Sequence, residues 1–124
     1  MRELNEISGE IVDAAIKVHS RLGPGLLESA YEACLRFELG RRDLHVESQV
    51  RLPVRYDDVL IECGYRLDLV VENQIIVELK AVEELHPIHQ AQMLSYLKLS
   101  GKKVGLLINF HCLHLKDGIK RLVN

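Results

Sequence analysis

The sequence predicts an α/β fold in which helices flank a central mixed β-sheet, and three features carry this prediction. Apolar residues recur at helical spacing over about residues 5–22. The apolar period then shortens to that of β-strands between about residues 50 and 81. A continuous apolar run at 104–110 is typical of a strand buried on both faces. A helix between these strands supplies a crossover connection, so the expected element order is α-α-β-β-β-α-β-β.

Two helices are expected before the first strand. The first, over about residues 5–22, should end at Gly23-Pro24-Gly25, because glycine suits the end of a helix and proline cannot continue it. The second should run over about 26–39, with Gly40 as its stop. The residues of this helix expected to face the core are Ala30, Cys34 and Phe37.

Five strands and a third helix are expected in the rest of the chain. The first strand covers about residues 50–56, and Pro53 within it indicates an edge position in the sheet. A turn at Asp57-Asp58 follows this strand. The remaining expected elements are strands at about 60–71 and 75–81, a helix from His86-Pro87 to about Leu99 that Gly101 closes, strands at 104–110 and near 112–115, and a terminal turn or helix.

The composition is that of an ordinary globular protein. Its 124 residues suit a single domain over residues 1–124, and 48% hydrophobic with 27% charged residues argues against wholesale disorder. No apolar run approaches the ~18 residues of a membrane span, and the first six residues lack the apolar region of a signal peptide. We therefore expect a cytoplasmic protein with no membrane partner. The net charge of −2 argues mildly against a nucleic-acid partner, which usually requires a basic surface.

The cysteines and histidines predict neither a disulfide nor a zinc site. Cys34, Cys63 and Cys112 are odd in number, widely spaced and without a CxxC pair, which favours small apolar core residues. His111 and His114 would point to opposite faces of a strand and should not converge on one ion. No cysteine or histidine pair elsewhere completes a four-ligand set with these two histidines or with His86 and His89.

A polar signature interrupts the apolar hairpin of the second and third expected strands. Asp68, Glu78 and Lys80 lie in strands that are otherwise apolar, where charged groups are costly unless they pair or hold a metal ion. Side chains alternate between the two faces of a strand, so Glu78 and Lys80 share one face. The side on which Asp68 lies depends on the length of the hairpin loop.

Two loop lengths are compatible with this hairpin. A two-residue turn at Asn73-Gln74 would put the carboxylates of Asp68 and Glu78 on opposite faces. A three-residue loop at 72–74 pairs the two residues directly, with Asn73 or Gln74 in the left-handed position, which asparagine tolerates better. We expect the three-residue loop.

Directly opposed carboxylates can share one cation, since opposed Cβ atoms lie ~4.5–5.5 Å apart. Mg²⁺ prefers six oxygen ligands, commonly one or two carboxylates with waters and phosphate oxygens. Asp68 and Glu78 are therefore candidate metal ligands, and the carbonyl of Leu79 is a further candidate. The same residues also suit an ion-paired Asp–Glu–Lys cluster on a solvated sheet face, and the hairpin alone does not separate the two interpretations.

The two helices nearest the hairpin carry further candidates. Glu28 and Glu32 form a like-charged pair one turn apart, and Glu28 could supply a third carboxylate or simply favour the helix start. On the later helix, His89, Gln92 and Tyr96 are expected to share a face that could contact phosphate or simply meet solvent. The apolar residues expected opposite them are Met93, Leu94 and Leu97.

In this order of motifs the chain resembles the GxxExxY proteins, a branch of the PD-(D/E)XK nuclease superfamily. The resemblance covers nearly the whole chain. The motif that names the branch stands here as Gly25-Leu26-Leu27-Glu28-Ser29-Ala30-Tyr31. The other matching segments are Val18-His19, Leu22-Gly23-Pro24-Gly25, Tyr65-Arg66-Leu67-Asp68, Ile76-Val77-Glu78-Leu79-Lys80-Ala81, His89-x-x-Gln92-x-x-x-Tyr96-Leu97 and Gly105-Leu106-Leu107-Ile108-Asn109-Phe110.

The resemblance implies a restriction-endonuclease-like core and a set of site residues. Asp68 and Glu78 would be metal ligands, and Lys80 would lie at the attacking water. Glu28 would complete the metal site, as its counterpart does in the lambda-exonuclease-like branch of the superfamily. The residues matching the QxxxY motif of that branch, which helps to position substrate, are Gln92 and Tyr96. Leu67 stands where the superfamily often has proline, a departure that is common within it.

The sequence therefore predicts a nuclease that uses Mg²⁺ to hydrolyse phosphodiester bonds, with DNA as the expected substrate and Mn²⁺ expected to substitute. Carboxylates favour the charged form of a neighbouring lysine, so Lys80 is expected to act as a cation rather than as a general base. The alternatives are a catalytically inactive module that binds nucleic acid or a protein partner, and an enzyme acting on another phosphate ester. A homodimer is compatible with so small a chain.

Overall fold

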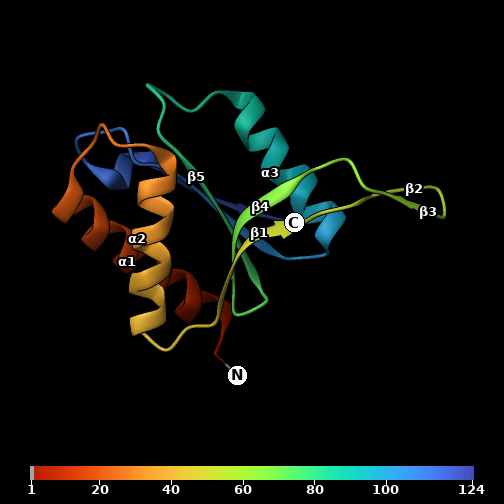
Figure 1. Cartoon of the computed structure of the whole chain (residues 1–124), viewed down its shortest axis with the longest axis horizontal. Coiled ribbons are helices and arrows are strands. Elements are labelled where there is room, and N and C mark those ends of the chain that lie inside the picture. Colours follow the sequence, from red (N-terminus) through yellow and green to blue (C-terminus); the bar gives the residue numbers. More distant parts are fainter. Residues whose placement is uncertain (1) are drawn as a thin grey trace.

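The computed structural model describes residues 2–124 and has three layers (Figure 1). Helices α1 and α2 cover one face of a five-stranded mixed sheet, and α3 covers the other. The predicted α/β class, with helices flanking a central mixed sheet, is confirmed. The elements are α1 (Leu4–Leu22), α2 (Glu28–Arg41), β1 (Val46–Arg51), β2 (Val54–Tyr56), β3 (Val59–Ile61), β4 (Arg66–Val71), β5 (Ile75–Lys80), α3 (Pro87–Ser100), β6 (Val104–Asn109), the 3₁₀ turn η1 (Leu115–Gly118) and β7 (Ile119–Val123).

The strand order of the central sheet is β1-β4-β5-β6-β7. β4 and β5 form an antiparallel hairpin, and β5 and β6 are parallel because α3 carries the chain back across the sheet. All six residues of β6 are buried, as the unbroken apolar run predicted. β1 lies at one edge, as the neighbouring proline indicated, and β7 lies at the other. β4 and β5 thus lie side by side in the interior of the sheet, with their polar residues at one end.

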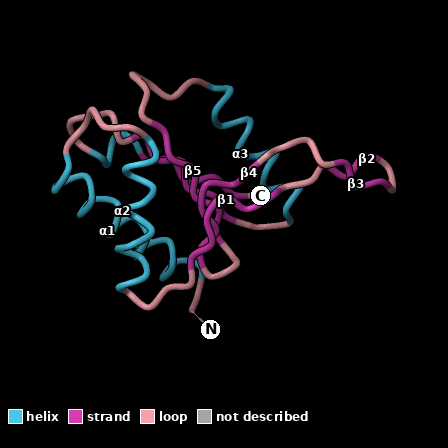
Figure 2. Tube along the Cα trace, in the orientation of Figure 1, coloured by secondary structure: helices cyan, strands magenta, loops and turns pink. Residues whose placement is uncertain are grey.

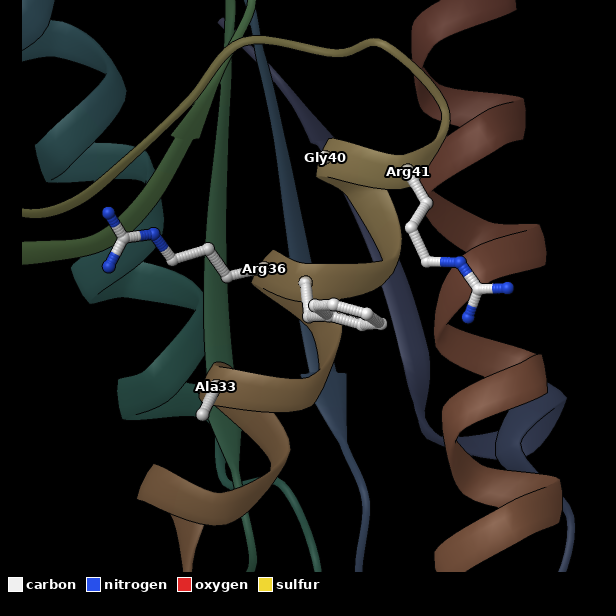
Figure 3. A pocket seen from close by; sticks show the side chains of 5 residues that line it. Ala33, Arg36, Gly40 and Arg41 are labelled. Carbon is white, nitrogen blue, oxygen red and sulfur yellow. The ribbon is translucent and has the colours of Figure 1, made fainter.

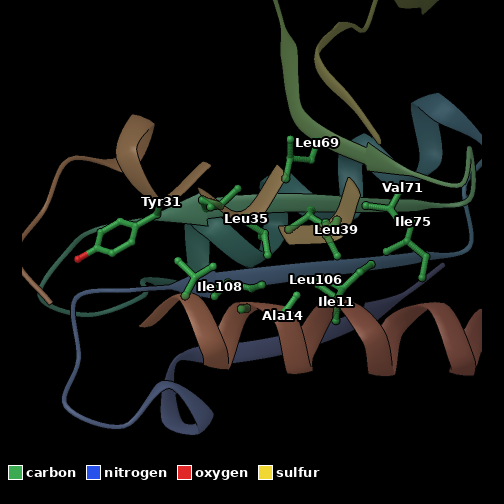
Figure 4. Close-up of a cluster of buried hydrophobic side chains, with 14 of the residues drawn as sticks. Ile11, Ala14, Tyr31, Leu35, Leu39, Leu69, Val71, Ile75, Leu106 and Ile108 are labelled. Atoms are coloured by element: carbon green, nitrogen blue, oxygen red, sulfur yellow. The ribbon is translucent and has the colours of Figure 1, made fainter. Parts of the chain in front are cut away.

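Two apolar cores lie on the two faces of the sheet. The larger one joins α1 and α2 to the sheet through side chains that include Ile11, Leu35 and Ile75 (Figure 4). The smaller one lies beneath α3 and includes Met93 and Leu97. Because both faces are covered, β5 is apolar on both sides until it reaches Glu78.

The face of α2 that contacts the core differs from the prediction. Phe37 is 65% exposed, Cys34 is exposed and Ala30 is only half-buried, so the predicted core face was wrong by about one residue. Gly40 also lies inside the helix rather than ending it. The residues of α2 that are buried are Tyr31, Leu35, Glu38 and Leu39.

The outward position of Phe37 has a visible compensation. The guanidinium of Arg41 lies 5.4 Å from the centre of the Phe37 ring, a cation–π contact that shields part of an exposed aromatic surface. Both residues line a shallow pocket of about 500 Å³ on the outer face of α2, from which Arg36 and Arg41 extend in opposite directions (Figure 3). Phe37 therefore belongs to a surface feature of α2.

Several predicted strand boundaries were also wrong. The strand expected at 50–56 is two strands, β1 and β2, because Pro53 interrupts pairing between them. The strand expected at 60–71 is likewise divided, into β3 and β4. The turn at Asp57-Asp58 is confirmed. The expected strand near 112–115 is absent from the described part of the chain, where a bend and a 3₁₀ turn stand instead, and the terminal turn or helix is the strand β7.

The cysteines are less buried than predicted. Cys34 and Cys63 are exposed, so assigning them to the core was wrong. Cys112 is half-buried, packs against the larger core and donates its Sγ–H to the Asn109 carbonyl at 3.2 Å. Burial raises the pKa of the Cys112 thiol, which suits an inert structural role.

β2 and β3 form a separate two-stranded ribbon that projects away from the three layers (Figure 2). The ribbon connects β1 to β4, and the backbone N–H of Leu52 donates to the Tyr65 carbonyl at 3.1 Å where it leaves the body. Within residues 2–124, no helix combines the length and the apolar character that crossing a bilayer requires.

Candidate active site

The hairpin of β4 and β5 has the predicted register. Leu69 pairs with Val77 and Val71 with Ile75, which leaves a three-residue loop and brings Asp68 opposite Glu78. Asn73 adopts a left-handed backbone with φ 55°, as expected. Glu72 does the same with φ 53°, which the sequence did not indicate. The loop length therefore sets the two carboxylates against each other on neighbouring strands.

The regular ladder ends where these two carboxylates begin. The backbone N–H of Asp68 donates to Glu78 Oε2 at 2.6 Å, and the backbone N–H of Leu79 donates to Asp68 Oδ2 at 2.9 Å. A carboxylate oxygen of one strand thus accepts a backbone N–H of the other strand, in the place of a backbone carbonyl. This exchange satisfies backbone donors that would otherwise lose their partners where the strands separate.

Gln49 on the edge strand β1 contributes a conformation that is rare in strands. Its φ is 52°, and the β1–β4 ladder has no pair at Gln49 and Asp68, although pairing continues on both sides. Residues two apart in a regular strand face the same side, yet Leu67 packs in the smaller core and Leu69 in the larger one. The strand β4 is therefore irregular at Asp68. The Gln49 amide donates to both carboxylate oxygens of Glu32, at 3.0 and 3.2 Å.

The loop before α2 is held by Tyr31, which places Glu28 at the end of β5. The Tyr31 hydroxyl donates to the Gly23 carbonyl at 2.6 Å and accepts from the Leu26 N–H at 3.1 Å. Its ring stacks on Phe110 with centroids 4.5 Å apart. Glu28, in the first turn of α2, accepts the Ala81 N–H on Oε2 at 3.1 Å. The glutamate and tyrosine of the first motif therefore act together in this chain, since the tyrosine fixes the turn from which the glutamate projects.

Burial and mutual repulsion raise the pKa values of the clustered carboxylates. Glu78 is 7% exposed, and burial together with the charge of Asp68 raises its pKa to about 8. Burial likewise raises the pKa of Asp68 above its usual value, against the hydrogen bond from Leu79 and the charge of Lys80. For Glu32, burial raises the pKa and the Gln49 hydrogen bond lowers it. Such a cluster is short of positive charge.

Lys80 lies two residues beyond Glu78, at the half-buried last position of β5. Its charge lowers the pKa values of both Asp68 and Glu78, although less than burial raises them. Among residues 2–124, the ion pairs do not include Lys80. The ammonium group therefore lies beside the carboxylates without being fixed to one of them.

The three candidates on α3 do not share one environment. Tyr96 is buried with Met93 and Leu97, so its predicted place opposite these residues was wrong. Its ring meets Tyr65 edge to face at 5.9 Å, and burial, then the charge of Glu78, raises the pKa of its phenol. Leu94, expected in the apolar face, is 38% exposed.

The other two α3 candidates lie nearer the surface. His89 is half-buried, and burial, then the charge of Lys80, lowers the pKa of its imidazole. Its Nδ1 accepts the backbone N–H of His86 at 3.0 Å, which caps the helix. Gln92 is exposed one turn before Tyr96. Tyr96 and His89 are thus linked electrostatically to the carboxylates and to Lys80, respectively, whereas Gln92 presents its amide to solvent.

Asn109 is a buried polar residue that supports the end of β5. Its side chain is 4% exposed, accepts the Val82 N–H at 3.1 Å and donates to the Val82 carbonyl at 2.8 Å. Lys80 is its neighbour in the β5–β6 register, and the Lys80 carbonyl accepts the Phe110 N–H. The loop that follows Lys80 is thereby fixed to the end of β6.

Three residues of this site escaped the sequence interpretation in whole or in part. Glu32 was identified only as the neighbour of Glu28, Asn109 only as part of a segment that matches the family, and Gln49 not at all. A buried asparagine at a strand end and a glutamine in an otherwise alternating strand were the available signals. Neither signal shows which group the side-chain amide would contact, which is Glu32 for Gln49 and the Val82 backbone for Asn109.

A helix-covered mixed sheet, with carboxylates and a lysine at the open end of its central hairpin, is the arrangement of a nuclease-type α/β domain. A family model, the PD-(D/E)XK nuclease superfamily, matches residues 5–122, and the chain belongs to this superfamily. No significant match is found among curated proteins or among solved structures. The family assignment and the fold together make this end of the sheet the candidate active site.

Nucleases of this superfamily typically use divalent metal ions, and the donor chemistry of the site fits such an ion. Asp68, Glu78, Glu28 and Glu32 offer carboxylate oxygens only, the ligand type that hard cations prefer. Within residues 2–124, however, no three acidic, histidine or cysteine side chains are spaced to coordinate one ion together. Asp68, Glu78 and Glu28 each accept a backbone N–H through one carboxylate oxygen, whereas Glu32 accepts the Gln49 amide through both oxygens.

Proposed function

We propose that this chain is a single-domain nuclease that uses Mg²⁺ to hydrolyse phosphodiester bonds, with DNA as its substrate. The observation that carries the proposal is the pair formed by half-buried Asp68 and buried Glu78, opposed across the hairpin, with Lys80 two residues beyond Glu78. Membership of the PD-(D/E)XK nuclease superfamily supports the same chemistry. Mn²⁺ should replace Mg²⁺, since both accept carboxylate and water ligands.

In this proposal Asp68, Glu78 and Glu28 hold the ion, with the Leu79 carbonyl as a further ligand. A bound divalent cation supplies Lewis acidity at the phosphate and a water of lowered pKa. Lys80 donates hydrogen bonds that orient the attacking water and offset the negative charge that develops on the phosphate. Its freedom from ion pairs in the described residues supports this role.

The α3 residues are proposed to position the nucleic acid. Tyr96 presents a phenol beside the carboxylates from a buried, rigid setting, which favours orientation over proton transfer. Gln92 lies one turn before Tyr96 and His89 lies two turns before it, and both can donate hydrogen bonds to phosphate oxygens. The helix would thus border the path of the substrate backbone.

A cleavage assay tests the proposal. The protein is expected to degrade a DNA substrate with Mg²⁺ or Mn²⁺ and to lose all cleavage with excess EDTA, and a structured RNA run in parallel tests the preference for DNA. Absence of cleavage with every substrate and ion would favour the catalytically inactive module that binds nucleic acid. Because the net charge is −2, the electrostatic part of its affinity for nucleic acid should be weak. In that case gel-shift binding that does not depend on the metal ion is expected.

Gln49→Gly should separate stability from activity. A left-handed backbone costs a residue other than glycine on the order of 1–3 kcal/mol, so glycine relieves strain at this position while removing the amide that holds Glu32. We expect the free energy of unfolding to stay unchanged or to rise. Cleavage should fall about tenfold or more, because the Gln49 amide also hydrogen-bonds the proposed ligand Asp68 and lowers its pKa. Chemical denaturation and initial cleavage rates measure the two effects. Destabilisation with normal cleavage would contradict this role for Gln49.

A further inference from the structure

Tyr65 is an exposed aromatic residue next to the candidate active site. It lies three residues before Asp68, where the chain returns from the ribbon of β2 and β3 to the central sheet (Figure 1), and it is 42% exposed. Its ring meets that of Tyr96 edge to face, with the centroids 5.9 Å apart. Burial, then the ionisable groups of Glu78 and Tyr65, raise the pKa of the Tyr96 phenol, which therefore lies close to both. Tyr65 thus extends the site beyond the carboxylates by one exposed ring.

Hydrogen bonds at the base of the ribbon hold the backbone of Tyr65 in place. Its carbonyl accepts the Leu52 N–H at 3.1 Å and a guanidinium N–H of Arg66 at 3.0 Å. Just before it, Gly64 has φ 84°, in the left-handed region that favours glycine, and donates its N–H to Glu62 Oε1 at 2.9 Å. The exposed ring therefore projects from a fixed turn, which lowers the cost of ordering it when a ligand binds.

A groove of about 310 Å³ lies next to Tyr65, between the ribbon and the C-terminal end of α3. It is here called the ribbon groove. Leu52, whose N–H binds the Tyr65 carbonyl, contributes to its apolar lining together with Leu67. Its volume is at the lower end of the ~300–1,000 Å³ of ligand sites, so it admits a base or a sugar but not a duplex. Tyr65 and the ribbon groove therefore form one continuous surface that begins at the carboxylates.

The charged lining of the ribbon groove is mainly cationic. The basic residues that line it are Arg51, Arg55 and Lys102. Within residues 2–124, no ion pair includes any of these three, and the Lys102 ammonium donates to the neutral Asn73 side chain at 3.1 Å. The acidic residue in the lining is Glu47, and its carboxylate contacts His45 at 3.1 Å. The ribbon groove therefore offers its positive charge to an anionic ligand.

The pairing of β1 with β4 adds a second sign of an anionic ligand. Arg51 lies directly opposite Arg66 in this ladder, and like charges in such positions destabilise a sheet. Glu62 contacts the guanidinium of Arg66 at 3.5 Å, whereas Arg51 has no acidic partner among the described residues. The acidic turn Asp57-Asp58 lies at the far tip of the ribbon, outside the groove lining. A bound phosphate would supply the negative charge that is missing at Arg51.

We infer that the ribbon groove binds a single strand of DNA, with an unpaired base stacked on Tyr65 and phosphates held by the basic residues of the groove. Sites for single strands combine a cationic groove with aromatic side chains on which bases stack. In a duplex each base face is covered by the neighbouring pair, so a duplex offers Tyr65 nothing to stack on. The inference rests on the proposed function, which makes nucleic acid the ligand, and adds that the substrate is single-stranded beside the carboxylates.

Fluorescence anisotropy with a labelled DNA strand of about 12 nucleotides tests the inference. Binding is measured in EDTA on proteins that carry Glu78→Gln, so that the DNA stays intact. The single strand should bind at least about tenfold more tightly than a blunt duplex of the same sequence. Tyr65→Ala should weaken this binding about tenfold, the loss typical of one stacking platform, whereas Tyr65→Phe keeps the ring and should stay within about threefold.

Tyr56→Ala is the matched control for the loss of the ring. Tyr56 is 67% exposed on the same ribbon but lies outside the groove lining, so its removal should change the affinity by less than about threefold. Thermal melting establishes that each variant keeps the fold. If Tyr65→Ala unfolds because its ring packs on Tyr96, the charge of the groove still tests the inference.

The dependence of the affinity on salt provides this second readout. Arg51→Gln should weaken single-strand binding and reduce the slope of log affinity against log salt by about 0.7, the value for one phosphate contact. Arg21→Gln removes an equal charge from the exposed last turn of α1, on the opposite face of the sheet. It should leave this slope unchanged.

Three results would overturn the inference. The first is a duplex that binds as tightly as the single strand, or a single strand that does not bind. The second is an equal effect of Tyr65→Ala and Tyr56→Ala, and the third is an unchanged salt slope in Arg51→Gln. Failure of the proposed function looks different. In that case the single strand binds and depends on Tyr65, but the chain that keeps Glu78 does not cleave it with Mg²⁺ or Mn²⁺.

Discussion

Replacing Lys80 by alanine is expected to lower the rate of cleavage by at least about 10²–10³-fold, the loss typical of removing one group that stabilises developing charge. Divalent-cation affinity should change little, because the carboxylates that are proposed to hold the ion remain. The free energy of unfolding should also change little, since Lys80 forms no ion pair among the described residues. Single-turnover cleavage and Mn²⁺ binding by calorimetry measure the two effects.

Lys98→Ala provides the control for this prediction. Lys98 is an exposed lysine in the last turn of α3, so its removal changes the net charge equally but removes no group beside the carboxylates. Its cleavage rate should stay within about threefold of wild type, allowing for screened long-range effects. Near-normal cleavage by Lys80→Ala, or an equal loss in both variants, would show that Lys80 has no specific role.

The second large effect concerns Glu78 and pH. Its folded-state pKa of about 8 exceeds the reference value of 4.5, so the folded protein binds more protons than the unfolded chain between these values. The free energy of unfolding without metal ions should therefore fall as pH rises from about 4.5 to about 8, by up to about 1.4 kcal/mol per pH unit. Above about pH 8, Glu78→Gln should be more stable than wild type by a few kcal/mol.

Chemical denaturation in EDTA at several pH values measures this effect. Glu78→Gln keeps an acceptor for the Asp68 N–H but removes the buried charge, so its stability should depend less on pH. Glu83→Gln, at an exposed position in the loop after β5, should behave like wild type. Equal pH dependence in wild type and Glu78→Gln would mean that Glu78 is not a strained, buried acid.

The hairpin could be predicted because its geometry follows from counting. Side chains alternate in a strand, so the loop length alone decides whether Asp68 meets Glu78, and the three-residue loop was found. The buried strand β6 and the crossover through α3 were equally direct, since an unbroken apolar run needs cover on both faces. These features follow from the local sequence pattern, and only a few structures are compatible with each pattern.

What escaped prediction depended on contacts between distant segments. Phe37 looks like a core residue in sequence, yet α2 buries Leu35 and Leu39 and leaves the ring beneath Arg41. A terminal turn or helix was predicted where β7 lies, and the strand carries Lys120 and Arg121, because charged residues are common on edge strands. The amide of Gln49 donates to Glu32 from a position of β1 whose backbone is left-handed, and neither the backbone conformation nor the partner follows from the local sequence pattern.

The measurement that tests the central claim most directly is a calorimetric Mn²⁺ titration of wild type and Glu78→Gln, at a pH above the Glu78 pKa of about 8. Carboxylates bind cations only when ionised, so affinity should increase as pH rises towards this value. We predict saturable binding to the wild type and its loss in Glu78→Gln. No binding to the wild type, or equal binding to both proteins, would contradict a metal centre built on Asp68 and Glu78.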